Sequence, residues 1–412
     1  MFKLKEVIIS ITNRCNLRCL MCQIPDEKTE ELSTAQWRKT IKDVSSLGVQ
    51  TIVFSGGEPL LREDIFELIS FTKNHHMNAC LTSNGCLINQ NTALQLSQSG
   101  INVVNISIEG DKLIHDFLRG KDSFDKAVLA LEYLKMHKIE STVAATVSRY
   151  NFKCLKSVLE LAKAKKATTV RFQPFSRIFL KDTLSGDDFF IDKKEKERLQ
   201  EIIEDTIKLS NEYKISTNPV SYLRNIPSYL CKEKIAAKNG CSALWASCPI
   251  NSKGEVFPCW SLTSQDRVIG NITQESLVDL WFSNRHDQIR ESVLQAGCFG
   301  CMMSCYDEVF GNDGNKKNLA KKIKKMNKLK SYEKIFDMSL QFLKSEITKF
   351  RLRYRFYKSY RGGFKKVFLR LINNIKRIPQ AKNVNPQEEI KFSLLELNIA
   401  KDRIKKEISK YR

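Results

Sequence analysis

The stretch VIISITNRCNLRCLMCQ, residues 7–23, joins a short apolar run to three cysteines that lie within eight positions. The run has the length and the β-branched content of a buried strand. Cys15, Cys19 and Cys22 follow it with the spacing Cys-x3-Cys-x2-Cys. The first fifteen residues contain no secretory signal, so we expect a cytoplasmic, reducing compartment in which closely spaced cysteines bind metal.

Three thiolates from one tight loop suit an iron–sulfur cluster. A [4Fe-4S] cluster takes four ligands, so three cysteines would leave one iron open to a ligand from outside the protein. Zinc is the competing metal, but a structural zinc site usually needs a fourth Cys or His nearby. His75 and His76 lie far along the chain. The spacing therefore favours a cluster with one reactive iron.

The composition indicates a folded protein whose positive charge is concentrated in a tail. Of the 412 residues, 42% are hydrophobic, and no apolar run is long enough to span a bilayer. Residues 311–412 hold 29 Lys and Arg against 9 Asp and Glu, whereas residues 1–310 hold 39 against 37. The net charge of +22 therefore describes the tail, and nucleic acid is not the expected partner of the body.

Short β-rich runs alternate with helical patterns along the first half of the chain. We predict strands at Val7–Thr12, Thr51–Ser55, Met77–Ser83, Val103–Glu109, Ser141–Ser148 and Thr169–Pro174. We predict helices near 33–47, 62–74, 89–98, 123–137, 151–165 and 192–213. This rhythm predicts parallel strands in an open or closed α/β barrel, with reactive groups at the carboxyl ends of the strands.

Sequence motifs stand at those predicted strand ends. They are the cysteine loop, Ser55-Gly56-Gly57-Glu58-Pro59, Ser83-Asn84-Gly85 and Ser107-Ile108-Glu109-Gly110. In the second motif, two glycines allow the backbone to approach a ligand closely, and the proline fixes the turn. An ordinary turn between strand and helix is the alternative, and a Ser or acid at a strand end can also be a helix cap.

These residues resemble the radical S-adenosylmethionine (SAM) enzymes. The CxxxCxxC loop of that family matches Cys15, Cys19 and Cys22, and its GGEP motif stands unaltered at Gly56–Pro59. The likeness continues through 83–85, 107–110 and 115–120, and it covers about residues 5–310. It implies a partial (β/α)6 barrel.

The resemblance also implies the chemistry of the site. The three cysteines would hold a [4Fe-4S] cluster that binds SAM and injects one electron, and the resulting 5′-deoxyadenosyl radical would abstract hydrogen from a substrate. Residues expected to contact SAM are Gly56, Gly57, Glu58, Pro59, Ser83, Ser107, Glu109 and Met21. Met21 departs from the family pattern, which often has an aromatic residue beside adenine, but a thioether can fill the same space.

A second group of cysteines lies in residues 241–310. Cys241-x12-Gly254-x4-Cys259 is followed by Cys298-x2-Cys301-x3-Cys305. This resembles the SPASM extension of radical SAM enzymes, which holds one or two auxiliary [4Fe-4S] clusters. The five thiols suffice for one cluster, and the implied ligands are Cys241, Cys259, Cys298 and Cys301, with Cys305 as the alternate fourth ligand. A zinc ribbon is the competing interpretation, and Cys248 is expected to be buried on a strand.

These patterns predict four segments, with boundaries set by changes in composition. They are the barrel (1–215), a linker (216–240), the SPASM domain (241–310) and a Lys/Arg-rich helical tail (311–412). Apolar and basic residues alternate at helical spacing over 364–378. Such a helix packs on a protein surface or lies on an anionic membrane, so peripheral membrane contact is one expectation.

The sequence therefore predicts a radical SAM oxidoreductase or maturase with an external one-electron reductant. Because the SPASM architecture is linked chiefly to peptide maturation, a peptide or protein is the expected substrate. The alternative substrates are a small molecule and a glycan, including a lipid-linked one. A zinc module that binds nucleic acid without catalysis is the more distant alternative. The sequence names no catalytic acid, base or hydrogen donor.

Overall fold

The structure, a computed structural model, describes residues 4–26, 30–180, 186–233, 243–263, 267–296 and 301–303. The chain divides into two units, Met1–Asp313 and Gly314–Arg412, and every described residue belongs to the first. The predicted helical tail therefore lies outside the described residues. So do three of the predicted auxiliary ligands, Cys241, Cys298 and Cys305.

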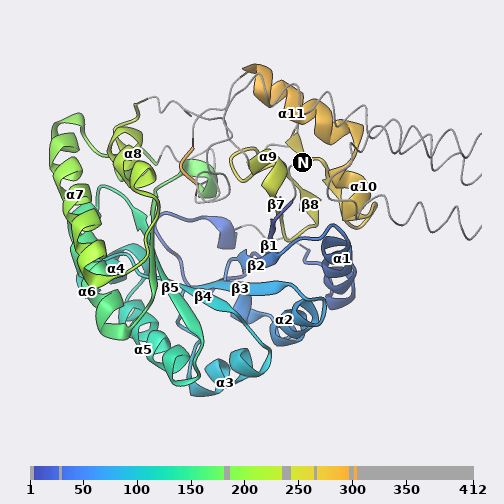
Figure 1. The fold of residues 1–412 in the computed structure, drawn as a ribbon, viewed down its shortest axis with the longest axis horizontal. Coiled ribbons are helices and arrows are strands. Elements are labelled where there is room, and N and C mark those ends of the chain that lie inside the picture. Colours follow the sequence, from blue (N-terminus) through green and yellow to red (C-terminus); the bar gives the residue numbers. More distant parts are fainter. Residues whose placement is uncertain are drawn as a thin grey trace, which may run out of the picture. The chain divides into compact units, whose positions relative to one another are not determined.

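The strands of the described chain form one nine-stranded sheet in the order β6-β5-β4-β3-β2-β1-β7-β8-β9 (Figure 1). The bounds are β1 Glu6–Thr12, β2 Thr51–Gly56, β3 Asn78–Ser83, β4 Val103–Ser107, β5 Glu140–Val147, β6 Thr169–Pro174, β7 Ser247–Ile250, β8 Glu255–Val256 and β9 Gly270–Asn271. Strands β1 to β6 pair in parallel with their neighbours. The order is linear and does not close, so the predicted partial α/β barrel is confirmed.

The helices of the described chain have the bounds α1 Thr34–Ser46, α2 Ile65–Asn74, α3 Gln90–Gln98, α4 Lys112–Arg119, α5 Ser123–Met136, α6 Leu155–Lys165, α7 Lys196–Tyr213, α8 Val220–Leu230, α9 Ala243–Ala246, α10 Leu277–Trp281 and α11 Asn284–Ala296. Helices α1 to α3 and α5 to α7 cover the outer side of the curved sheet (Figure 1). The six predicted helices are present as α1 to α3 and α5 to α7. The sequence analysis missed α4, and it placed α8 within a linker.

The local sequence explains why these elements form. In β1 the side chains of Val7, Ile9 and Ile11 are fully buried, which is the period-two pattern of a strand on a core. Helix α1 begins with a capping box, in which the Ser33 Oγ accepts from the Gln36 N–H and the Gln36 side chain accepts from the Ser33 N–H. These local signals place the cysteines between a buried strand and a firmly started helix.

The predicted SPASM segment continues the sheet of the barrel. Strand β7 pairs in parallel with β1, from Glu6 opposite Ser247 to Ile9 opposite Ile250. Cys248 is fully buried in β7, as its place in the pattern predicted. The division into barrel, linker and SPASM domain stays a prediction. The sheet nevertheless runs across it, so strand pairing couples the two cysteine-rich regions.

No helix among the described residues is both long and apolar enough to cross a membrane.

Candidate active site

The three cysteines of the first motif lie in the loop that follows β1, residues 13–26, here called the cysteine loop. All three are free thiols with partly buried side chains. The loop touches the end of α4, because the Leu20 N–H donates to the Leu118 carbonyl at 2.9 Å. One further bond, from the Cys22 N–H to the Cys19 carbonyl at 3.1 Å, closes a turn between two of the cysteines.

Two side chains donate to the sulfur atoms, one from the residue after β3 and one from the last residue of α4. The Asn84 Nδ2 lies 3.8 Å from the Cys15 Sγ, and the Arg119 Nη1 lies 3.9 Å from the Cys19 Sγ. Donors of this kind stabilise thiolate ligands and tune a cluster's potential. Two of the three sulfur atoms therefore have the N–H donors that commonly surround metal-bound thiolates.

Burial and a nearby cation act on these thiols in opposite directions. Burial raises the pKa of each, and it raises the pKa of Cys22 to about 11. The Arg119 guanidinium opposes this effect, because its positive charge favours the thiolate of Cys19. The thiols are therefore protonated near neutral pH until a metal displaces their protons.

The donor set matches the ligands of an iron–sulfur cluster. In a [4Fe-4S] cluster each thiolate binds a different iron, so the three thiols of one loop can serve one cluster and leave its fourth iron open.

The Gly56–Pro59 motif packs directly against the start of the cysteine loop. The Gly57 N–H donates to the Thr12 carbonyl at 2.7 Å, and the Glu58 N–H donates to the Arg14 carbonyl at 2.8 Å. A Cβ on Gly56 would stand 2.3 Å from the Thr12 carbonyl oxygen, and one on Gly57 would stand 2.2 Å from that of Arg14. The glycines thus allow two backbones to meet, and the ligand approach predicted for them stays a prediction.

Glu58 uses its carboxylate to tie β2 to β3. The side chain is fully buried. Its oxygens accept from the Ser83 hydroxyl at 3.0 Å, the Asn84 N–H at 2.9 Å and the Leu60 N–H at 3.3 Å. Burial raises the pKa of Glu58 to about 7, and these donors only partly offset it. Because these three donors all belong to the protein itself, Glu58 positions the strand ends.

This carboxyl group makes the stability of the cluster-free protein depend on pH. Folded Glu58 keeps its proton up to about pH 7, whereas the unfolded carboxyl loses it near 4.5. The free energy of unfolding should therefore fall as the pH rises through this window, by on the order of 3 kcal/mol. Denaturant unfolding of wild type and Glu58→Gln across the window measures this term. Curves that run parallel for the two proteins would contradict it.

Glu109 and Arg119 form a buried ion pair beside the cysteine loop. The Arg119 Nε and Nη2 donate to Glu109 Oε1 at 2.7 and 2.5 Å, and the Thr146 N–H donates to Oε2 at 2.7 Å. The Asn151 Nδ2 donates to the Glu109 carbonyl at 2.8 Å. The His115 Nδ1 accepts from the Glu109 N–H at 3.2 Å, and burial lowers the pKa of this histidine to about 3. Glu109 is thus held on every side, and it aims Arg119 at the cysteine loop.

The structure brings the predicted residues of four strand ends to one edge of the sheet. Ser83 and Ser107 end β3 and β4 and are nearly buried, and Met21 is buried within the cysteine loop. The sequence analysis assigned no role to Asn84, Arg119 or His115. These residues stand inside motifs that were quoted, but their contacts with the thiols and with Glu109 depend on the tertiary fold.

Two of the predicted auxiliary ligands, Cys259 and Cys301, are among the described residues, and the side chains of both are partly buried. The segment Cys301–Met303 is fixed to the barrel by two contacts. The buried Tyr222 hydroxyl of α8 donates to the Met302 carbonyl, and the Gln173 Nε2 of β6 lies 3.5 Å from the Met303 Sδ. The barrel therefore holds the backbone beside Cys301.

Comparison with known families agrees with this geometry. The model of the radical SAM superfamily matches residues 9–162. The model of SPASM, an iron–sulfur cluster-binding domain, matches residues 241–306. The two matches cover both cysteine-rich regions.

The similar proteins include enzymes named as synthases and enzymes named as maturases. Fe-coproporphyrin III synthase of Methanosarcina barkeri is 33% identical over 170 residues, which are 40% of this chain and 43% of that protein. AdoMet-dependent heme synthase of the same organism is 28% identical over 66% of this chain and 80% of its own length. Mycofactocin maturase MftC of Mycolicibacterium smegmatis is 27% identical over 71% of this chain and 74% of its own length.

Solved structures share the fold. SuiB of Streptococcus suis bound to S-adenosylmethionine has a TM-score of 0.58 at 17% identity, over 74% of this chain and 72% of that one. The anSMEcpe structure with bound AdoMet has a TM-score of 0.57 at 20% identity, over 78% of this chain and 95% of that one. The chain belongs to the radical SAM superfamily with a C-terminal SPASM domain, and it is an enzyme that uses SAM and iron–sulfur clusters.

Proposed function

We propose that the cysteine loop holds the SAM-binding [4Fe-4S] cluster through Cys15, Cys19 and Cys22. The observation that carries this proposal is the placement of three free thiols at the strand-end edge, with N–H donors on Cys15 and Cys19. When bound there, the cluster would supply one electron to SAM, whose cleavage would give methionine and the 5′-deoxyadenosyl radical that abstracts hydrogen. The protein's own part is to orient SAM and substrate and to exclude water.

The surrounding residues have separate roles in this proposal. Gly56–Pro59 fixes the start of the cysteine loop, and its backbone would contact SAM together with Ser83, Ser107 and Met21. Arg119, which Glu109 holds in place, supplies a fixed positive charge beside the anionic thiolates. The auxiliary cluster takes Cys241, Cys259, Cys298 and Cys301, with Cys305 as the alternate ligand.

We propose a peptide or protein as the substrate. The SPASM match and the maturase MftC among the similar proteins support this choice. Two structures that share the fold, SuiB with the precursor peptide SuiA and anSMEcpe with the peptide Cp18Cys, are peptide complexes. The reaction would be hydrogen abstraction from a residue that enters at the carboxyl ends of the strands.

An iron porphyrin is the second candidate substrate. The observation that favours it is the sequence identity to enzymes named Fe-coproporphyrin III synthase and AdoMet-dependent heme synthase. A small-molecule substrate was also the alternative predicted from the sequence.

Isotope transfer distinguishes the two candidates. A deuterated extract of the source organism is first separated into peptides, iron porphyrins and other small molecules. The reconstituted full chain is then incubated anaerobically with SAM, dithionite and each fraction in turn. Deuterium in the 5′-deoxyadenosine from the peptide fraction alone is the expected result. Deuterium from the porphyrin fraction would support the second candidate. If no fraction yields 5′-deoxyadenosine, the proposed cluster chemistry is refuted.

A further inference from the structure

Arg62 lies three residues after Pro59, and its side chain is almost completely buried. Its Nε and Nη2 donate to the two oxygens of Asp64 at 2.8 and 2.7 Å. Thr34, at the start of α1, donates its hydroxyl to the same carboxylate at 2.6 Å. One edge of the guanidinium is therefore fixed by a bidentate ion pair, and this pair is itself bound to α1.

The remaining nitrogen of Arg62 reaches the chain on both sides of the cysteine loop. Its Nη1 donates to the Ile11 carbonyl at 3.3 Å and to the Leu32 carbonyl at 3.1 Å, and it lies 3.4 Å from Glu31 Oε2. Ile11 is in β1, just before the loop, and Glu31 and Leu32 lie just before α1. A single buried group thus holds the segment that enters the loop beside the segment that leaves it.

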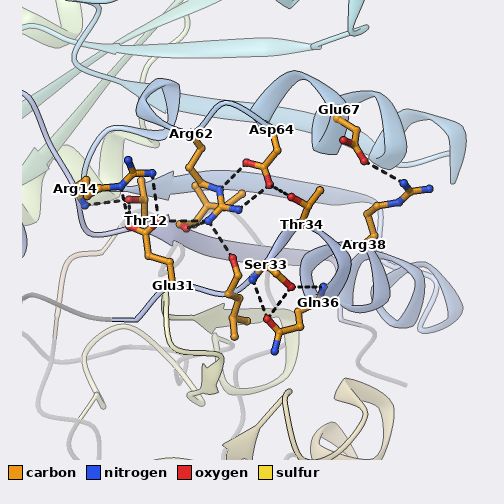
Figure 2. A network of polar contacts seen from close by, with 12 residues as sticks. Thr12, Arg14, Glu31, Ser33, Thr34, Gln36, Arg38, Arg62, Asp64 and Glu67 are labelled. Carbon is orange, nitrogen blue, oxygen red and sulfur yellow. Dashed lines mark hydrogen bonds and ion pairs between the residues drawn. The ribbon is translucent and has the colours of Figure 1, made fainter.

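Glu31 extends the same contact to the first residues of the loop. It accepts from the Thr12 hydroxyl and from the Arg14 Nε and Nη2, the latter two at 3.3 and 3.4 Å. The Arg14 N–H in turn donates to the Thr12 Oγ1 at 3.0 Å. Figure 2 shows Arg62 between Glu31 and Asp64, with Thr12 and Arg14 on the far side of Glu31.

A loop closed at its base has fewer conformations, so less ordering is required when its thiols bind irons. Only arginine has a planar fork that serves a bidentate carboxylate and two carbonyls at once, and a lysine ammonium lacks that geometry. We propose that Arg62 closes the cysteine loop at its base and is thereby a positioning residue for the SAM-binding cluster. This inference rests on the proposed assignment of Cys15, Cys19 and Cys22 as cluster ligands.

The test compares two substitutions at Arg62 with a matched control in the full chain. Arg62→Met removes every bond, and Arg62→Lys keeps the charge without the fork. Arg38→Met is the control, because Arg38 is half-exposed and pairs with Glu67 at 3.1 Å on the outer side (Figure 2). After anaerobic reconstitution, iron content, the reduced electron paramagnetic resonance spectrum with and without SAM, and the unfolding midpoint before reconstitution are measured.

SAM alters the spectrum only of a cluster with an open iron, so the two kinds of cluster can be distinguished. In Arg62→Met the intensity of the SAM-responsive signal is expected to fall about tenfold or more, while the signal of the auxiliary cluster persists. In Arg62→Lys the SAM-responsive signal is expected to be only partly restored. Arg38→Met should match wild type. A full SAM-responsive signal in Arg62→Met, or an equal loss of both signals, would overturn the inference alone. A wild-type protein without a SAM-responsive signal would overturn the proposed function as well.

Discussion

Gly57→Ala is expected to prevent assembly of the SAM-binding cluster. The added Cβ would stand 2.2 Å from the Arg14 carbonyl oxygen and 2.7 Å from that of Asn13. Both obstacles are backbone atoms, so no side-chain rotation relieves the contact. Either Gly57 moves and breaks its bond to the Thr12 carbonyl, or the start of the cysteine loop moves with its thiols. Iron content and the SAM-responsive spectrum after reconstitution measure the loss.

Gly100→Ala is the matched control for this substitution. Gly100 has a φ of +79° and lies between α3 and β4, where its neighbours are side-chain atoms of Lys73. Alanine there costs about 1 kcal/mol of stability through its backbone conformation, but it does not touch the cysteine loop. We expect normal cluster content in this variant. A Gly57→Ala protein with the same cluster content would contradict the packing role given to Gly57.

Replacement of Cys15, Cys19 and Cys22 together by alanine is expected to reduce 5′-deoxyadenosine formation to the level of a blank without enzyme. The cluster would pass the electron from the reductant to SAM, and no residue of the chain can replace it in that role. The auxiliary cluster should survive, because its proposed ligands lie in a different segment. Iron content, the reduced spectrum and chromatographic measurement of 5′-deoxyadenosine test both statements.

Cys80→Ala is the control for the triple variant. Cys80 lies in β3, opposite Val103, and is likewise a partly buried free thiol. The substitution removes a thiol but none of the proposed ligands, so SAM cleavage should be retained. SAM cleavage that persists in the triple variant would refute the ligand assignment.

Most of the barrel could be predicted from the sequence because its signals are local. Each of the six predicted strands begins and ends within two residues of the observed one. Helix α4 was missed because it is only eight residues long and most of it overlaps the motif at 115–120, which was examined for chemistry. Helix α8 was placed within the linker, although Pro219 stands just before its first residue and Pro227 is accommodated near its end.

The residue types of the candidate site could be predicted, but their contacts could not. The pattern placed Glu58 among the residues expected to contact SAM, whereas the fold buries its carboxylate between two strand ends. Arg119 and Arg62 act on the cysteine loop from positions about 100 and 50 residues away along the chain. No local periodicity reports such a contact, because it depends on how parallel strands bring their carboxyl ends together.

The most direct test of the central claim is anaerobic reconstitution of the full chain with iron and sulfide, followed by SAM and dithionite. If the cysteine loop holds a SAM-binding cluster and the SPASM domain holds one more, the protein should contain about eight irons per chain. It should release 5′-deoxyadenosine only when dithionite is present. A protein that binds zinc in place of iron, or one that is loaded with iron and leaves SAM intact, would contradict the account.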